Sequence, residues 1–212
     1  MKCLPKIYIL IFIFLFLLIA GFPPAQILAA PAADQVVFVL SKENTTSGTG
    51  QAIHKVTFGI EKGSGAVPVC LTTTIEYNLN VFSLFTEADL SPSSAANSIN
   101  KDVTPNLSKN SQGIIKVGVG VEDYNDTPLP DGDLFTINFK VKSGATPSAD
   151  DVFITHDISE GPNQASNSGA TLLKVADESG EIFDSTLDVA DSGSSSGSKG
   201  SCFIGSLIGL HK

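Results

Sequence analysis

The clearest structural pattern in the chain is Phe135-Thr-Ile-Asn-Phe-Lys-Val-Lys142. Apolar and polar residues alternate strictly along it. The apolar set is Phe135, Ile137, Phe139 and Val141, and the polar set is Thr136, Asn138, Lys140 and Lys142. A period of two residues is typical of a strand that turns one face to a core and the other to a polar environment. The stretch therefore predicts a half-buried β-strand.

Two other stretches show the same alternation, at 67–79 and 115–122. In the first, Val67, Val69, Leu71, Ile75 and Tyr77 share the predicted inward face, and Cys70, Thr72, Thr74 and Glu76 share the outward one. In the second, Ile115, Val117, Val119 and Val121 oppose Lys116, Gly118, Gly120 and Glu122. Weaker patterns predict strands at 36–41, 53–60, 152–158, 170–175 and 182–189.

Turn-forming residues separate these strands. Clusters of Gly, Ser, Asn, Asp and Pro occupy 46–50, 63–65, 125–132, 144–149 and 161–169, where strands must reverse. Only 86–96 is compatible with a helical turn. Many short strands with one polar face each, and no long amphipathic helix, predict an all-β, antiparallel β-sandwich.

The two ends differ from this middle part. Residues 1–30 hold Lys2 and Lys6, an apolar block at 7–20 and a small-residue exit, which predicts a secretory signal peptide and a secreted, extracellular or cell-surface protein. The domain then spans 31–190, and a Ser/Gly-rich linker covers 191–201. The tail at 202–212 contains Cys202 and an apolar run too short to cross a bilayer. Two alternatives remain open for it: a disordered terminus, or a sorting signal in which Cys202 is lipidated and provides the only attachment to a membrane.

Composition limits the function. The chain holds 13 Lys+Arg, every one of them lysine, against 22 Asp+Glu, for a net charge of −9. Such an acidic chain does not have the basic surface that nucleic-acid binding needs. Of the three cysteines, Cys3 lies in the predicted signal, which leaves Cys70 and Cys202. A bond between these two is arithmetically allowed, and no metal-type cysteine spacing occurs.

Catalysis has little support in the sequence. A serine or cysteine nucleophile needs a base within hydrogen-bond reach, and the three histidines are His54, His156 and His211. No G-x-S-x-G sequence occurs, and Cys70 has no cation beside it in sequence to activate its thiol. We therefore expect a protein that is not an enzyme and that has no cofactor other than a possible structural Ca²⁺ ion.

The order of the strands resembles that of cohesin domains. The resemblance lies in 65–84 (GAVPVCLTTTIEYNLNVFSL), in 113–123 (GIIKVGVGVED) and in 132–145 (GDLFTINFKVKSGA), with 181–189 as the closing strand. It covers about residues 34–190. It implies a jelly-roll sandwich of about nine strands that binds dockerin modules in polysaccharide-degrading or cell-surface assemblies. On that resemblance the partner-binding residues are Cys70, Thr72, Thr74 and Glu76.

Other functions remain open beside a dockerin-like partner. A carbohydrate-binding module of the same fold would bind a polysaccharide through Tyr124, because aromatic rings stack on sugars. The oxygens of Asp123, Asp126, Asp131 and Asp133 suit a structural Ca²⁺ ion, although such residues are also ordinary in a solvated turn. A purely structural surface protein would need no ligand.

Overall fold

The computed structural model describes residues 30–120, 127–155, 163–166, 174–176 and 182–183. The chain divides into two units, Met1–Ala30 and Pro31–Lys212. All described residues except Ala30 belong to the second unit. Within these described ranges, no helix is both long enough and apolar enough to span a membrane.

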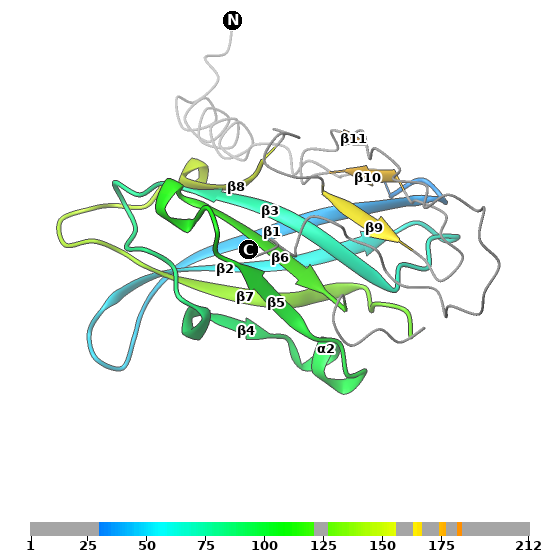
Figure 1. Ribbon diagram of the computed structural model, residues 1–212, viewed down its shortest axis with the longest axis horizontal. Helices are drawn as coiled ribbons and strands as arrows, with labels where there is room; N and C mark the ends of the chain where they lie inside the picture. Colours follow the sequence, from blue (N-terminus) through cyan, green and yellow to red (C-terminus); the bar gives the residue numbers. More distant parts are fainter. Residues whose placement is uncertain (1–29, 121–126, 156–162, 167–173, 177–181, 184–212) are drawn as a thin grey trace, which may run out of the picture. The chain divides into compact units, whose positions relative to one another are not determined.

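The first sheet has six strands in the order β11-β10-β1-β2-β7-β4 (Figure 1). Its strands are β1 (Gln35–Thr46), β2 (Ala52–Lys62), β4 (Leu90–Pro92), β7 (Gly132–Lys140), β10 (Lys174–Ala176) and β11 (Ile182–Phe183). Neighbouring strands are antiparallel, except that β1 and β10 run parallel. The long β1–β2 hairpin and β7 form most of this layer.

The second sheet is built around β3 and has the order β5-β6-β3-β8, with β9 also paired to β3. Its strands are β3 (Cys70–Tyr77), β5 (Val103–Asn106), β6 (Ile114–Val119), β8 (Val152–Ile154) and β9 (Gln164–Ser166). The strands β8 and β9 follow each other along one edge of β3. The first pairs with Ile75–Tyr77 and the second with Cys70–Thr72.

The two sheets share one hydrophobic core. The chain alternates between them, so that β1 and β2, β4, β7, and β10 and β11 lie in the first sheet and the others in the second. The core joins inward side chains from both sheets, among them Phe38, Phe58, Phe135, Leu71, Ile75 and Ile115. The protein is therefore a jelly-roll β-sandwich.

Stacked aromatic rings fill much of this core. Phe58 stacks on Phe135 with ring centroids 4.7 Å apart, and Phe38 meets Phe58 edge-on at 5.2 Å. Phe139 contacts Tyr77 at 5.1 Å. Such pairs stabilise a core beyond the area they bury, and each ring comes from an inward position of the period-two pattern.

The predicted all-β sandwich is confirmed, with several differences in detail. Three short strands, β4, β5 and β9, were not predicted, and β9 lies inside the predicted turn at 161–169. One strand pair is parallel. Val67 is 48 % exposed and precedes β3, so its predicted inward position is wrong. The short strands escape prediction because three or four residues cannot show a period.

Four short helices complete the described chain. The 3-10 helix η1 (Glu87–Asp89) lies within the helical turn predicted in 86–96, and α2 (Ser94–Ser98) begins there and ends beyond it. The prediction that only this stretch could hold a helical turn is wrong, because two more short helices lie elsewhere. The 3-10 helix η2 (Asn110–Gln112) leads into β6, and η3 (Ala149–Asp151) leads into β8. Gly113 ends η2 at φ 79°, and a side chain there would lie 2.4 Å from the Tyr77 carbonyl oxygen. Only glycine therefore fits at the start of β6.

Candidate interaction surface

The candidate surface is the outer face of the second sheet, the face turned away from the core. Strand register arranges its residues in rows across β8 or β9, β3, β6 and β5. The rows are Phe153, Glu76 and Ile114; then Thr74, Lys116 and Asn106; then Gln164, Thr72, Gly118 and Thr104; then Ser166 and Cys70. The four residues predicted to bind a partner thus do lie on one face, along β3.

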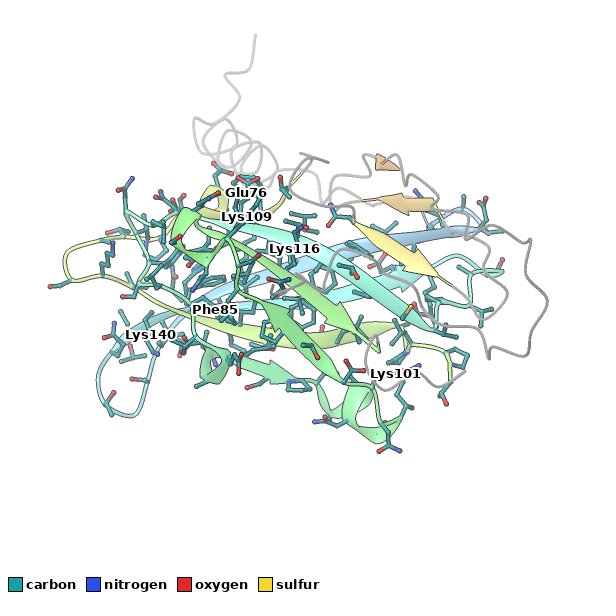
Figure 2. All side chains as sticks on the ribbon, in the orientation of Figure 1. Glu76, Phe85, Lys101, Lys109, Lys116 and Lys140 are labelled. Carbon is teal, nitrogen blue, oxygen red and sulfur yellow. The ribbon has the colours of Figure 1, made fainter. Side chains whose placement is uncertain are left out.

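One end of this face is accessible. The Phe153 side chain is 41 % exposed, which is unusual for a phenylalanine on a strand. Glu76, Ile114 and Lys116 are half-buried beside it. Figure 2 labels Glu76 and Lys116 at this end, together with Lys109, which precedes η2. We call the row of Phe153, Glu76 and Ile114 with Lys116 the open end.

The other end of the face is covered. Cys70 and Thr74 are 0 % exposed, Thr72 is 1 % exposed, and Gly118 is buried. Three of the four residues predicted to bind a partner are therefore buried, and Glu76 alone is partly accessible. That the four contact a partner stays a prediction. We call Cys70, Thr72, Thr74 and Gly118 the covered end.

Cys70 is disulfide-bonded. A sulfur in a disulfide has no thiolate to act as a nucleophile, so Cys70 in this state has no reactive thiol. The other cysteines of the chain, Cys3 and Cys202, both lie outside the described residues. Lipidation of Cys202 therefore stays a prediction.

A buried asparagine closes the gap between β8 and β9 at the edge of β3. Asn163 Oδ1 accepts hydrogen bonds from the Thr74 backbone N–H at 2.8 Å and from Thr73 Oγ1 at 3.1 Å. Asn163 Nδ2 donates to the Thr155 carbonyl oxygen at 2.9 Å. The side chain thus takes the place of a strand backbone, because buried peptide groups need partners.

Two buried threonines on β3 differ in their partners. Thr73, which faces inward, donates to Asn163. Thr72 Oγ1 is buried at the covered end and has no hydrogen-bond partner among the described residues. A buried hydroxyl without a partner destabilises a fold, so Thr72 is the unusual one of the pair.

The corner after β3 is held by Tyr77. Its hydroxyl donates to Asn110 Oδ1 at 2.5 Å and accepts from the Phe85 N–H at 3.3 Å, while Asn110 Nδ2 donates to the Phe85 carbonyl at 2.8 Å. Burial raises the pKa of Tyr77, and the hydrogen bond from the Phe85 backbone acts against it. The inward position predicted for Tyr77 is correct, and its ring is not available to a ligand.

The proposed calcium ligands are only partly described. Asp131 Oδ1 accepts from the Lys62 backbone N–H at 2.9 Å, and Asp133 is exposed on β7. Where the structure describes the chain, no three His, Cys, Asp or Glu residues come together to hold a metal. Asp123 and Asp126 lie outside the described residues, and so does Tyr124. Calcium and carbohydrate binding there stay predictions.

His54 has a structural environment. Its Nδ1–H donates a hydrogen bond to Asn44 Oδ1 at 2.7 Å. Its ring stacks on that of Phe82, with ring centroids 5.4 Å apart. Nε2 is buried and has no partner in the described part of the chain. Burial lowers the pKa of His54, Lys42 lowers it further, and Asp151 acts in the opposite direction. His156 and His211 are outside the described residues.

Solved structures of similar shape are cohesin modules. The chain is similar to a type I cohesin–dockerin complex from Clostridium thermocellum (TM-score 0.47, 16 % identity, 68 % of this chain and 94 % of that one). It is also similar to the sixth cohesin of scaffoldin B from Acetivibrio cellulolyticus, solved with a Cel5 dockerin mutant. The TM-score is 0.45 and the sequence identity 20 %, over 66 % of this chain and 94 % of that one. Another similar structure is the second type II cohesin module of the adaptor scaffoldin ScaA from the same organism. Its TM-score is 0.45 and its sequence identity 17 %, over 72 % of this chain and 97 % of that one. No protein-family model and no curated protein matches the sequence.

Proposed function

We propose that this chain is an exported, non-catalytic, cohesin-like interaction module. Its partner is a dockerin-like protein module, bound on the outer face of the second sheet, in a cell-surface or polysaccharide-degrading assembly. The observation that supports this most is the open end, where an exposed Phe153 lies beside Glu76 in one row of the sheet. The sequence resemblance over 34–190 supplies the class of partner.

The open end has the chemistry of a protein-binding surface. An aromatic anchor surrounded by polar groups is typical of the residues that dominate binding energy. Phe153 would lose its remaining exposed area to the partner, while Glu76 and Lys116, of opposite charge, would set the orientation of the partner. Because β3 and β6 are paired on both sides, Glu76 and Lys116 are held in place before the partner arrives. Phe153 lies on the edge strand β8, which is paired with β3.

The experiment is a pull-down with the full exported chain as bait, in Ca²⁺ and in EDTA, with retained proteins identified by mass spectrometry. We expect a dockerin-bearing protein that EDTA releases, because the resemblance implies a partner that folds around Ca²⁺. Phe153→Ala and Glu76→Lys should each weaken its retention about tenfold or more. Glu61→Lys, at an exposed position on the outer face of β2, is the matched control and should bind as the parent does.

Two outcomes would contradict the proposal. One is retention of the partner by Phe153→Ala at the level of the parent, which would place binding elsewhere on the sandwich. The other is recovery of polysaccharide-bound material alone, which would favour the carbohydrate-binding alternative.

A further inference from the structure

The covered end is buried although it lies on the outer face of a two-layer sandwich. Cys70, Thr72, Thr74 and Gly118 turn away from the core, yet none reaches solvent. The described short helices have their main contacts elsewhere: α2 and η1 contact β7, and η2 contacts β6 where the chain enters that strand at Ile114. Among the described elements, β3 has its main contacts with its own sheet neighbours β6, β8 and β9. The buried side chain of Lys101 approaches Gly120, at the Cys70 end of the patch, and no main contact of β3 with a described helix accounts for the burial of Thr72 and Thr74.

Two further observations fall on the same patch. Cys70 is disulfide-bonded to a cysteine outside the described residues, and Thr72 Oγ1, two residues along the same strand face, is buried without a described partner. Buried hydroxyls are nearly always hydrogen-bonded in native proteins. Both observations therefore indicate that another segment of the chain forms the disulfide with Cys70 and contacts Thr72.

We propose that Cys70 and Cys202 form an intramolecular disulfide that holds the C-terminal segment 202–212 over the covered end. The alternative cysteine, Cys3, lies in the predicted signal peptide, which is removed on export. Disulfides form in the oxidising compartments that follow export, when Cys202 is the remaining candidate.

The chain is long enough for this bond. The segment 184–201 separates β11 from Cys202, and at about 3.3 Å per residue it can extend on the order of 60 Å. A domain of this size is on the order of 40 Å across. This segment is Ser/Gly-rich over 191–201, and a flexible chain of its length has a typical end-to-end distance of about 25 Å. Its full extension exceeds the width of the domain, so the bond closes without a strained connection.

Segment 203–210 and the covered end are chemically compatible. Residues 203–210 read FIGSLIGL, which is apolar and without charge. The covered end is likewise uncharged, and Gly118 adds no side chain beside Thr72. Burial of apolar residues on such a surface is favourable, and a backbone group of the segment supplies the partner that Thr72 Oγ1 needs.

Formation of the bond is a two-electron oxidation. The Cys70 and Cys202 thiols each lose one proton and one electron, and the S–S bond forms between them. The electrons pass by thiol–disulfide exchange to a protein disulfide of a thiol oxidoreductase, which becomes a dithiol. A sulfur in this bond cannot carry a thioether lipid, so the disulfide and lipidation of Cys202 exclude each other in one molecule.

The proposed disulfide rests on the export that is part of the proposed function, but it does not need the dockerin-like partner. One consequence does rest on that partner. Segment 202–212 would occupy the covered end and leave Phe153 and Glu76 accessible. The partner would then bind only half of the sheet while the disulfide is intact.

Peptide mapping tests the bond. The full exported chain is denatured with its free thiols alkylated and is digested with trypsin without reduction. Cleavage at lysines places Cys70 in peptide 63–101, Cys202 in 200–212 and Cys3 in 3–6. We expect 63–101 linked to 200–212, separable by reduction. Alkylated Cys70, a link to 3–6, a link between two copies of 63–101, or a lipid on Cys202 would each overturn the proposal.

Hydrogen exchange tests where the segment lies. We expect the amides of 203–210 to exchange at least tenfold more slowly in the disulfide-bonded protein than in Cys202→Ser. Ser196→Ala in the linker is the control and should keep the slow exchange. Equally fast exchange in the parent and in Cys202→Ser would show that the segment is bonded but not seated on the sheet, and would overturn that part of the proposal.

Discussion

The central strands of the two sheets, β2 and β3, differ in what covers their outer faces. On β2, Lys55 and Thr57 are half-buried and Glu61 is exposed. Lys55 forms an ion pair with Glu43 at 2.7 Å, and the two side chains are 40 % and 61 % exposed. On β3, Cys70, Thr72 and Thr74 are buried. Both strands alternate apolar and polar residues, yet the outer face of β2 meets water at Lys55, Thr57 and Glu61, whereas that of β3 is buried except at its Glu76 end.

The difference lies in the kind of polar residue. The outer face of β2 has lysine and glutamate, which are almost never fully buried unless paired. The covered end of β3 has threonine and cysteine, which are small, uncharged and tolerant of burial. Charge, rather than polarity alone, therefore distinguishes an outer face that meets water from one that is covered.

Introducing a lysine on the outer face of each strand should change stability most. Thr74→Lys should destabilise the fold by about 3 kcal/mol or more, because it buries an unpaired charge. Thr57→Lys, at a half-buried position on β2, should cost less than about 1 kcal/mol. Urea unfolding of the two variants measures the difference. If both cost the same small amount, the cover over β3 moves aside freely and the comparison fails.

The next effect concerns the edge of β3. Asn163→Ala removes an acceptor for Thr73 and Thr74 and a donor to Thr155, and should cost about 2 to 3 kcal/mol because buried groups lose their partners. Asn80→Ala, at an exposed position after β3, should stay within about 0.5 kcal/mol. Chemical denaturation measures both. A cost below about 1 kcal/mol for Asn163→Ala would mean that β8 and β9 do not depend on this bridge.

A smaller effect separates the two buried threonines. Thr73→Val loses the hydrogen bond to Asn163 Oδ1 at 3.1 Å and should cost about 1 kcal/mol. If segment 202–212 supplies a partner to Thr72 Oγ1, Thr72→Val should cost about as much in the disulfide-bonded chain and close to nothing in Cys202→Ser. Thermal unfolding of the single and double variants measures this coupling. An equal cost in both backgrounds would show that Thr72 does not contact the segment.

The smallest expected effect is a dependence of stability on pH through His54. Because the folded-state pKa is lowered from its usual 6.5, the unfolded chain takes up a proton that the folded chain does not. The contribution of His54 is therefore complete above pH 6.5 and is lost as pH falls from there through the lowered folded-state pKa. We expect Tm to fall between about pH 7 and pH 5, and less so in His54→Phe, which keeps a ring against Phe82.

Two carboxylates provide a check on the pH result. Burial acts to raise the pKa of Asp89, but its hydrogen bonds with Lys140 and Thr86 outweigh burial, and the pKa is lowered. The pKa of Asp151 is lowered mainly by hydrogen bonds from Ser148 and Asn78, which outweigh a smaller effect of burial. Both carboxylates stabilise the fold at pH values above their usual pKa of 3.8. This stabilisation is lost only as the pH falls below 3.8, towards their lowered folded-state pKa values. They do not titrate between about pH 7 and pH 5, so a fall in Tm there that His54→Phe leaves unchanged would contradict the assignment to His54.

The inner face of the sandwich could be predicted from the sequence. Leu71, Ile75, Phe135 and Phe139 follow a period of two, and all are buried in the core. The burial of Thr72 and Thr74 could not be predicted, because alternation identifies two faces of a strand without showing what lies against the second. That depends on parts of the chain far away in sequence.

The candidate site was also only half predictable. Glu76 was identified by its place on β3, and Phe153 was not, although a large aromatic between inward Val152 and Ile154 was a signal for an exposed anchor. Asn163 lies in a cluster that looks like an ordinary turn, and its partners Thr73 and Thr74 are 90 and 89 residues away along the chain. Local pattern contains no information on such a bridge.

The parallel pairing of β1 with β10 has a consequence for how the chain folds. Gln35–Val37 of β1 pair with Lys174–Ala176 of β10, so this part of the sheet edge stays unpaired until β10 has been synthesised. During synthesis almost the whole domain emerges before this contact can form, and closing so long a loop is slow. Until then β1 presents an open edge on which a second chain could add a strand. The risk of aggregation through the Gln35–Val37 part of this edge therefore falls in the interval before β10 pairs with it.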